Sequence, residues 1–309
     1  MGRSDPRALF VTTETVDCVN HVHAWVSVFG DAIHWTYEHN GNNIRNIRND
    51  WQALDIAQRE KPDVIFYIGA CDAPGNPTPD VLKDLNNIAP LINFCSDAAD
   101  GPWHKEMVKY AKHSCFSLQV GIDGNSESCA DFNTLTPVDA RMFTSIGVSK
   151  RDIRCGFSGT VGRWNPRSEV ILALKWFGGL VVRDRAGPGS YQDHLDFMGR
   201  CQMVVNVSNT GTGNRHHIKG RVLECGYAGC CLLESEGSPI GDWFPDDCYF
   251  LYKDPPEAAH LIATLQDDQI RYAAKRLAEE VRTKYTARHI FSQILDAVDV
   301  HYPNKVEAA

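Results

Sequence analysis

The stretch HHIKGRVLECGYAGCCLL, His216–Leu233, combines the two patterns that decide the fold class. Its middle has apolar residues at helical spacing, and its end, CCLL, is a short apolar run typical of a buried strand. At about 100° per residue, one stripe of the helix holds His217, Gly220, Arg221, Glu224 and Ala228, and the other side holds Val222, Leu223, Gly226 and Tyr227. We therefore expect a helix that packs its apolar face on a sheet and shows cations at its start, with Glu224 about one turn later.

On both sides of this stretch, short apolar runs alternate with helical patterns, which indicates parallel sheets built from strand–helix–strand units. Nearly continuous apolar runs, such as DVIFYIG at residues 63–69, are typical of strands buried on both faces. We expect strands at residues 8–13, 63–69, 91–98, 115–121, 153–162, 179–183, 202–208, 230–233 and 246–252. Helices are expected at residues 18–29, 51–61, 167–178, 191–201 and over most of 255–300. The sequence thus predicts an α/β fold with two Rossmann-like domains and helices at the C-terminus.

A break in this periodic pattern at residues 133–149 predicts the domain junction. The segment LTPVDARMF contains Pro137 and has no clear period. We expect an N-terminal Rossmann-like domain at residues 1–137 and a second one at residues 138–285. The remaining residues, 286–309, are expected to form a helix that packs back toward the first domain.

Composition excludes several classes of protein. The 309 residues are 43% apolar and 23% charged, which is ordinary for a globular protein. No apolar run reaches the roughly 18 residues of a membrane span, and the N-terminus lacks the apolar segment of a secretory signal, so we expect a cytoplasmic protein. The 11 cysteines include no CxxC pair and no zinc-finger spacing, which predicts buried free thiols.

Charge is distributed unevenly along the chain. The net charge is −8, which argues against non-specific binding to nucleic acid or to acidic membranes. Residues 150–221, however, hold 12 Lys or Arg and 5 Asp or Glu, a net charge of +7, so the rest of the chain carries −15. A basic region inside an acidic chain predicts a local anion site, and chance clustering is the alternative.

The predicted helix of the opening stretch is a candidate phosphate site. Helix N-termini carry partial positive charge and unpaired N–H groups, and Lys219 and Arg221 would add full charges. A carboxylate beyond the phosphates, Glu224, is suited to accept hydrogen bonds from ribose hydroxyls, as in dinucleotide-binding folds. The alternative is a surface helix with an ion pair between Arg221 and Glu224 at i,i+3 spacing.

Two loops of the second domain are further candidates. FSGTVGR, Phe157–Arg163, runs from a strand end into a loop in which Ser158 and Gly159 would let amides approach an anion and Arg163 would contact it. An ordinary strand-to-helix turn is the alternative. NVSNTGTGNRHH, Asn206–His217, leaves the carboxyl end of a strand, where ligands of open α/β sheets bind.

Polar residues after the strands of the first domain could take part in catalysis. Asp97 and Asp72 follow expected strands, and His21 and His23 follow the first one. Each would face a ligand crevice if its strand points there; a capping or solvated role is the alternative. The two histidines are two residues apart on an expected helix start, so they face different ways and a metal pair is not expected.

Four blocks of the chain carry a resemblance to a known family. They are TPVDARMF, RDIRCGFSGTVGRWNPR, KGRVLECGYAGCCLLESE and the C-terminal YTARHIFSQIL. Together they resemble the spore-maturation-protein-like glycosyltransferases, which are family 4-like, retaining enzymes of the GT-B fold. The resemblance covers roughly residues 134–295, and the KGRVLECGYAGCCLL block is its most specific part. It implies two Rossmann-like domains that face each other across a cleft, with the acceptor bound by the first and the nucleotide sugar by the second.

The resemblance also implies roles for individual residues. Glu224 matches the acidic residue that binds the nucleotide ribose, and Lys219 and Arg221 match the basic start of its helix. Ser158, Gly159, Arg163 and Asn206 would complete the site for the nucleotide and its diphosphate. Many retaining relatives carry a second acidic residue eight positions before the first, near the transferred sugar. That position is His216 here, a departure that bears on the identity of the sugar.

These implications lead to a mechanism. The expected enzyme transfers a sugar from a UDP- or GDP-linked donor to a hydroxyl of a saccharide, a protein or a modified nucleic acid, with retention and without a metal or other cofactor. Arg163 and the cations at the helix start would stabilise the diphosphate leaving group. Asp97 or His21 would position the acceptor, or deprotonate it if the enzyme inverts.

Other functions remain open from the sequence. One is a phage-type glycosyltransferase that acts on DNA bases. Another is a non-catalytic protein that binds nucleotide sugars, suggested by His216 in place of an acid. A sugar-nucleotide epimerase would have the same fold. The sequence leaves the sugar, the acceptor and the oligomeric state open.

Overall fold

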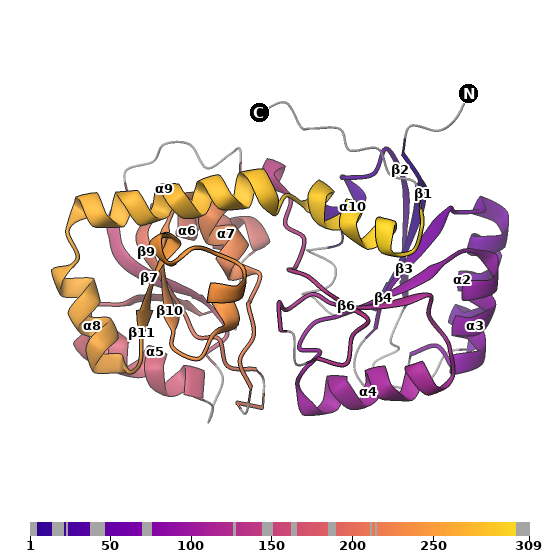
Figure 1. Cartoon of the computed structure of the whole chain (residues 1–309), viewed down its shortest axis with the longest axis horizontal. Coiled ribbons are helices and arrows are strands. Elements are labelled where there is room, and N and C mark those ends of the chain that lie inside the picture. Colours follow the sequence, from indigo (N-terminus) through magenta and orange to yellow (C-terminus); the bar gives the residue numbers. More distant parts are fainter. Residues whose placement is uncertain are drawn as a thin grey trace. The chain divides into compact units, whose positions relative to one another are not determined.

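The chain folds into two compact units. A computed structural model describes residues 5–13, 22, 24–37, 47–69, 76–125, 128–143, 151–161, 166–184, 190–210, 212–213 and 215–300. One unit comprises Met1–Pro137 and Ala287–Ala309, and the other comprises Val138–Thr286. In each unit helices pack around a parallel sheet (Figure 1).

The first unit contains a six-stranded parallel sheet in the order β2-β1-β3-β4-β5-β6. Its strands are β1 (Arg7–Thr13), β2 (Asp31–Tyr37), β3 (Val64–Ile68), β4 (Leu91–Cys95), β5 (Leu118–Gly121) and β6 (Phe132–Asn133). Its helices include α2 (Ile47–Glu60), α3 (Pro79–Ile88) and α4 (Gly101–Lys112). Every residue of β3 and β4 is buried, as their continuous apolar runs predict.

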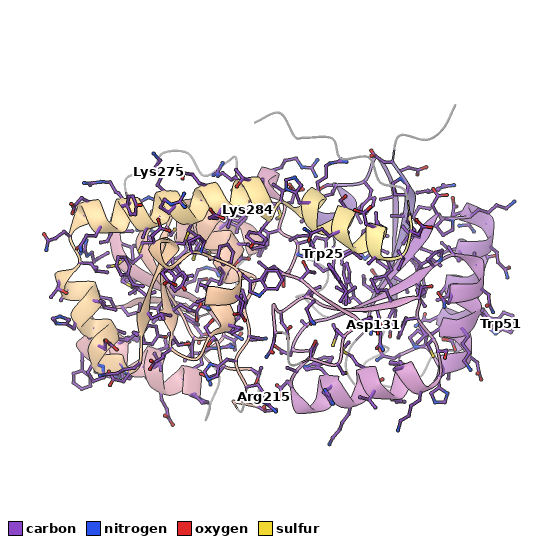
Figure 2. All side chains as sticks on the ribbon, viewed as in Figure 1. Trp25, Trp51, Asp131, Arg215, Lys275 and Lys284 are labelled. Atoms are coloured by element: carbon purple, nitrogen blue, oxygen red, sulfur yellow. The ribbon has the colours of Figure 1, made fainter. Side chains whose placement is uncertain are left out.

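The edge strand β2 was not expected from the sequence. Its signal is an alternation in which Ile33 and Trp35 pack against the core while His34 and Thr36 point the other way. Helix α2 is amphipathic, since its Ala53 and Ala57 are fully buried whereas its Trp51 is 71% exposed and projects outward (Figure 2). Trp25, before β2, is 2% exposed in the core of the unit (Figure 2).

The C-terminal helix α10 (Ala287–Ala297) belongs to the first unit. Its Phe291 is fully buried and lies within 5.0–6.2 Å, centroid to centroid, of five aromatic rings of that unit: Phe10, Trp25, Phe29, Phe66 and Phe94. Arg288 of the same helix donates to the carbonyl of Val28 at 3.0 Å. The end of the chain therefore completes the core of the beginning.

The second unit contains a five-stranded parallel sheet in the order β11-β10-β9-β7-β8. Its strands are β7 (Ile153–Gly159), β8 (Val181–Asp184), β9 (Cys201–Asn206), β10 (Cys231–Ser235) and β11 (Tyr249–Tyr252). Its helices are α5 (Pro166–Phe177), α6 (Tyr191–Arg200), α7 (Arg221–Ala228), α8 (Pro255–Thr264) and α9 (Asp267–Lys284), with short 3-10 turns at Ala140–Phe143, Pro239–Asp242 and Asp246–Cys248. The predicted α/β class with two Rossmann-like units is confirmed.

Helix α7 packs closely against α9. A Cβ on Gly226 of α7 would lie 2.6 Å from Cγ2 of Val281 on α9, so only glycine allows this approach. The prediction that this helix includes the basic residues before Arg221 and exposes one polar face is wrong. The helix begins only at Arg221, so His217 and Lys219 precede it, and all seven of its following residues are buried.

Candidate functional site

Polar side chains gather at the carboxyl edge of the second sheet. Ser158 near the end of β7, Asn206 at the end of β9 and Glu234 near the end of β10 are each at most 1% exposed. Carboxyl ends of parallel strands share one edge, so these groups lie together where α/β folds bind ligands. Buried polar groups need partners; Asn206 and Glu234 pair with each other, and helices α6 and α7 supply His194 and Arg221.

Arg221, the first residue of α7, is the cation of this cluster. Its Nη1 donates to Oδ1 of Asn206 at 2.7 Å, its Nη2 donates to the carbonyl of Ser158 at 2.6 Å, and its guanidinium lies 4.7 Å from the ring centroid of Phe157. Its buried Nε has no hydrogen-bond partner among the described residues. Burial lowers the pKa of Arg221, but arginine starts so high that it stays charged. The site therefore holds a fixed, desolvated positive charge.

Gly159 provides the space for this guanidinium. A Cβ built on Gly159 would lie only 2.5 Å from Nη2 of Arg221 and 3.2 Å from the ring of Phe157. The sequence predicts that this glycine lets an anion approach closely, and that role stays a prediction. In the structure its lack of a side chain lets the cation reach the end of β7.

Glu224, one turn into α7, is held by helix α6. Its Oε1 accepts from the hydroxyl of Tyr191 at 2.5 Å, and its Oε2 lies 3.0 Å from Nε2 of His194. The other ring nitrogen of His194 lies 2.8 Å from Oγ of Ser158. The carboxylate is 5% exposed, so these contacts fix its position at the same sheet edge as Arg221.

A second polar chain runs from Glu234 to His216. Asn206 donates from Nδ2 to Oε2 of Glu234 at 2.7 Å, and Oε1 accepts from the backbone N–H of Ser235 at 3.0 Å. Oγ of Ser235 lies 2.8 Å from Oγ of Ser208, which lies 2.7 Å from Nδ1 of His216. Burial raises the pKa of Glu234 to about 7, and burial with nearby cations lowers the pKa of His216. The imidazole is therefore neutral at neutral pH.

Comparison with known proteins identifies the family. A family model described as glycosyl transferase-like matches residues 139–296, just over half of the chain. The chain belongs to this family. The enzyme class predicted from the sequence, a glycosyltransferase, is thereby confirmed.

Solved structures agree with this assignment at the level of the fold. The glycosyltransferase is similar to Anabaena HepE in complex with UDP-glucose, with a TM-score of 0.63, 12% identity, and 95% of this chain and 99% of that chain covered. It is also similar to an α-glucosyltransferase in complex with UDP-glucose and DNA containing an abasic site, with a TM-score of 0.62, 8% identity, and 95% of this chain and 99% of that chain covered. For Burkholderia multivorans α,α-trehalose 6-phosphate synthase the TM-score is 0.61 and the identity 10%, with 95% of this chain and 98% of that chain covered. No curated protein matches the chain. The predicted GT-B fold is confirmed.

The predicted nucleotide-binding residues of the glycosyltransferase lie mostly in one connected region. Arg221 contacts both Ser158 and Asn206 directly, and the polar chains described above connect these residues to Glu224 and His216. Lys219 contacts the ring of His217, and its charge also acts on Glu234. The roles predicted for these residues stay predictions.

The predicted catalytic residues are less well covered. Arg163 and His21 lie outside the described residues, as do Asp72 and His23. Asp97 is described in the turn after β4, where it is partly exposed and has φ 60°. Asp tolerates this left-handed backbone better than most residues, and such conformations cluster at functional sites. Its role as an acceptor-positioning residue stays a prediction.

Sequence reasoning missed five residues of the cluster: Tyr191, His194, Ser208, Glu234 and Ser235. A signal existed for Glu234, because an acidic residue at the end of the apolar run CCLLES is costly to bury without partners. Tyr191 and His194 stand at i,i+3 spacing on one helix face, which carries little information alone.

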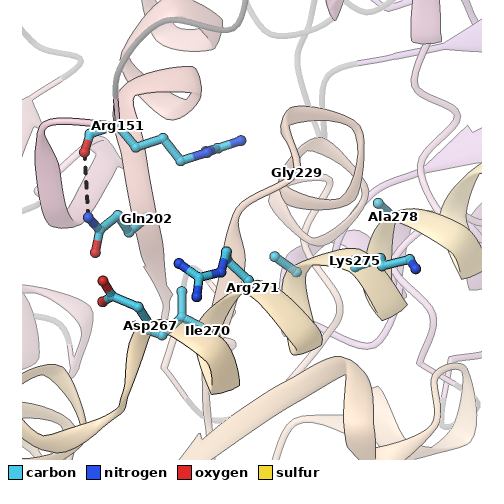
Figure 3. A pocket seen from close by; sticks show the side chains of 9 residues that line it. Arg151, Gln202, Gly229, Asp267, Ile270, Arg271, Lys275 and Ala278 are labelled. Carbon is cyan, nitrogen blue, oxygen red and sulfur yellow. Dashed lines mark hydrogen bonds between the residues drawn. The ribbon is translucent and has the colours of Figure 1, made fainter.

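A pocket of about 490 Å³ lies at the opposite, amino edge of this sheet (Figure 3). Its lining includes Arg151 before β7, Gln202 at the start of β9, and Asp267, Arg271 and Lys275 of α9. In that pocket the amide of Gln202 donates to the carbonyl of Arg151 at 3.5 Å. It contains none of the residues predicted for the donor.

In the ranges that the structure describes, no helix is both long and apolar enough to cross a bilayer. The same ranges hold no cluster of three or more His, Cys, Asp or Glu side chains that could bind a metal ion. The nine cysteines that fall within them are free thiols, and all but Cys129 are buried.

Proposed function

We propose that this glycosyltransferase uses a nucleoside-diphosphate sugar and binds it at the carboxyl edge of the second sheet. The observation that carries the proposal is the partly buried guanidinium of Arg221, held by Asn206 and Ser158 at the start of α7. Uridine is the favoured base, because similar folds were solved with UDP or UDP-glucose. Within the GT-B enzymes, the KGRVLECGYAGCCLL block supports the spore-maturation-protein-like group.

The diphosphate is the part of the donor that Arg221 would recognise. As the sugar leaves, negative charge develops on the diphosphate, and a pre-oriented cation stabilises that charge more than the ground state. Lys219, two residues before Arg221, and Arg163, four residues after the end of β7 in the sequence, would add positive charge. Fixed cations of this kind make a divalent metal unnecessary.

The nucleotide ribose would bind at Glu224. A carboxylate offers about four lone-pair sites, and Tyr191 and His194 occupy two of them. We expect the ribose hydroxyls to donate to this carboxylate. Because α6 already orients the carboxylate, little side-chain entropy is lost when the ribose binds.

The transferred hexose or pentose would extend toward His216, and residues of the first unit would bind the acceptor. Reaction with retention needs no protein base, so Asp97 or His21 would only orient the acceptor. An inverting reaction would require one of them to remove the hydroxyl proton. A saccharide, a protein or a modified nucleic acid fits this scheme.

Isothermal titration with UDP and GDP tests the donor site. Glu224→Ala should weaken binding of the preferred nucleotide more than tenfold, since the ribose loses its acceptor. Glu224→Gln, which keeps the volume, should weaken it less. Glu236→Ala, at an exposed position of the same unit, is the matched control. Wild-type affinity in both Glu224 variants would rule out this site.

DNA is a second candidate acceptor. Residues 150–221 carry a net charge of +7, and an α-glucosyltransferase of the same fold was solved with DNA. Fluorescence anisotropy with labelled duplex DNA tests this candidate. A DNA-acting enzyme should lose affinity steeply between about 50 and 200 mM salt as phosphate contacts are screened. Absence of DNA binding at the lower salt would exclude it.

A further inference from the structure

Glu234, near the end of β10, is a fully buried carboxyl group that the proposed reaction does not use. Its Oε2 accepts from Nδ2 of Asn206 at 2.7 Å, and its Oε1 accepts from the backbone N–H of Ser235 at 3.0 Å. Within the part of the chain that the structure describes, it forms no ion pair. Burial without an adjacent cation favours the protonated form of a carboxyl group, and it raises the pKa of Glu234 to about 7.

Asn206 connects this carboxyl group to the cation of the donor site. An arginine side chain only donates, so the amide oxygen of Asn206 faces Nη1 of Arg221 at 2.7 Å and its NH2 group faces Glu234. The orientation of the amide is therefore determined from both sides. The other end of the guanidinium donates to the carbonyl of Ser158 at 2.6 Å. Glu234 thus orients Asn206, and Asn206 holds one end of the Arg221 side chain.

Charged and titratable groups around Glu234 set the balance between its two protonation states. Lys219 and Arg221 stabilise the ionised form and lower its pKa, although burial has the larger effect. The phenols of Tyr252 and Tyr249 also interact with its charge, and their own raised pKa values keep them neutral near pH 7. A diphosphate bound beside Lys219 and Arg221 would offset the two positive charges. The ionised form of Glu234 would then lose stabilisation, and its pKa would rise.

We propose that Glu234 is a positioning residue of the donor site, which holds Arg221 through Asn206 and takes up a proton from solvent when the donor diphosphate binds. This inference rests on the proposed function, in which the diphosphate binds beside Arg221. Both protonation states of Glu234 keep Asn206 in place, because a protonated carboxyl group retains an accepting oxygen. The proton would sit on Oε1, which lies 3.4 Å from Oγ of Ser235, a hydroxyl that can accept its hydrogen bond.

Proton uptake is measured by isothermal titration of UDP-glucose into the full chain at pH 8, in buffers that differ in ionisation enthalpy. The diphosphate of UDP-glucose is esterified at both ends, so the ligand does not itself change protonation in this range. Neutralising a nearby cation raises a carboxyl pKa by about one unit or more. Starting from a pKa of about 7, Glu234 should therefore take up about 0.4 proton or more per bound UDP-glucose.

Glu234→Gln tests whether this carboxyl group is the one that takes up the proton. The glutamine cannot ionise but keeps an oxygen for Asn206, so proton uptake should fall by the amount assigned to Glu234. Because binding takes up a proton, the affinity of wild type relative to this variant should fall about fivefold from pH 6 to pH 8. Glu236→Gln, at an exposed position nearby, is the matched control and should take up as much as wild type. Equal uptake by wild type and Glu234→Gln would overturn the proposal.

Glu234→Met tests the positioning role, since methionine fills a similar volume but offers Asn206 no oxygen. At pH 6 it should bind UDP-glucose about tenfold more weakly than Glu234→Gln, the effect of one lost hydrogen bond. Equal affinities of these two variants would overturn positioning through Asn206. The methionine variant has no titrating group at this position either, so it replaces Glu234→Gln in the proton count if the glutamine variant fails to fold.

Histidines near the site can also take up a proton, since His216 lies close to His217 and Lys219. A protonated carboxyl group adds a C=O stretch that an imidazole lacks, so infrared difference spectra distinguish the two. Binding of UDP-glucose to wild-type protein at pH 8 should add such a band. Carbon-13-labelled glutamate should shift this band and leave the bands of the ligand in place. Absence of the band, or a band that the label does not shift, overturns the proposal without any variant.

The outcomes are separable from those of the proposed function. Failure of wild-type protein to bind UDP-glucose contradicts the proposed function, and the inference about Glu234 then falls with it. Binding of UDP-glucose without uptake of a proton by Glu234 overturns this inference alone and leaves the donor site standing. Binding with uptake that is lost in Glu234→Gln and kept in Glu236→Gln supports both.

Discussion

The guanidinium of Arg221 at the start of α7 donates to the amide oxygen of Asn206 at the end of β9, at 2.7 Å. This bond joins the two polar chains of the site. On one side Arg221 reaches Ser158, which contacts His194 and through it Glu224. On the other side Asn206 holds the carboxylate of Glu234. A disturbance at this bond should therefore affect both chains.

Arg221→Lys should lower the affinity for UDP about tenfold or more. A lysine ammonium is a point charge that cannot reach Asn206 and Ser158 in a planar fork while stacking on Phe157. Isothermal titration provides the measurement. Arg200→Lys is the control, because Arg200 makes an exposed ion pair with Asp152 in the same unit. Equal UDP affinities in the two variants would contradict the role of Arg221.

Gly159→Ala should displace the guanidinium of Arg221 without changing any charge. The new methyl group would lie 2.5 Å from Nη2, and overpacking of this kind costs about 1–3 kcal/mol. We expect a lower midpoint of urea unfolding together with weaker UDP binding. Gly179→Ala is the matched control, since Gly179 lies in the same unit and also has a positive φ of 67°, but a Cβ there meets no atom within 4 Å. A Gly159 variant as stable as this control would show that the space is not needed.

Much of the fold could be predicted because hydrophobic patterns carry it. The fully apolar runs of β3 and β4 and the helical spacing around Leu277 in α9 identify buried strands and a helix without tertiary information. The edge strand β2 is half-buried, so its pattern is weaker and it was missed. The start of α7 was placed too early, because the basic residues before Arg221 fit a helix as well as a loop.

The site was only partly predictable, for a different reason. Arg221, Glu224 and Asn206 stand beside recognisable strand and helix ends, so their location follows from the topology. Their partners do not follow from local sequence. Contact between Glu224 and His194 joins residues 30 positions apart, and contact between Asn206 and Glu234 joins residues 28 apart. Such pairs depend on how neighbouring helices and strands pack. No short sequence pattern indicates that packing.

Glu234→Gln should change the pH dependence of stability. Burial raises the pKa of Glu234 from 4.5 to about 7, so the folded wild type keeps a proton that the unfolded chain has already released in this range. The favourable contribution of the protonated form is complete below about pH 4.5 and is lost as pH rises to about 7. The glutamine variant cannot ionise. Relative to wild type, its free energy of unfolding should therefore rise by about 3 kcal/mol across this window, at about 1.4 kcal/mol per pKa unit.

Urea denaturation of both proteins at pH 5 and pH 8 measures this difference. Other titrating groups are common to the two proteins and cancel in the comparison. Glu236→Gln, exposed and next in the chain after Ser235, should show no such pH-dependent difference from wild type. A Glu234 variant whose stability relative to wild type is the same at both pH values would mean that this carboxyl titrates normally.

Phe291→Ala should destabilise the first unit although the residue lies near the end of the chain. Phe291 is fully buried against the rings of five aromatic residues, including Phe10 at 6.2 Å and Phe29 at 5.0 Å. Removing a buried phenylalanine side chain leaves a cavity and costs about 3–5 kcal/mol. Calorimetry should show a lowered transition for this unit, whereas Phe177→Ala, at an 89% exposed position, should leave the trace unchanged. The five rings that contact Phe291 all belong to the first unit. At a temperature where both units are folded, UDP affinity should therefore stay at the wild-type value. A loss of UDP binding without a change in stability would mean that α10 acts on the donor site instead of the core.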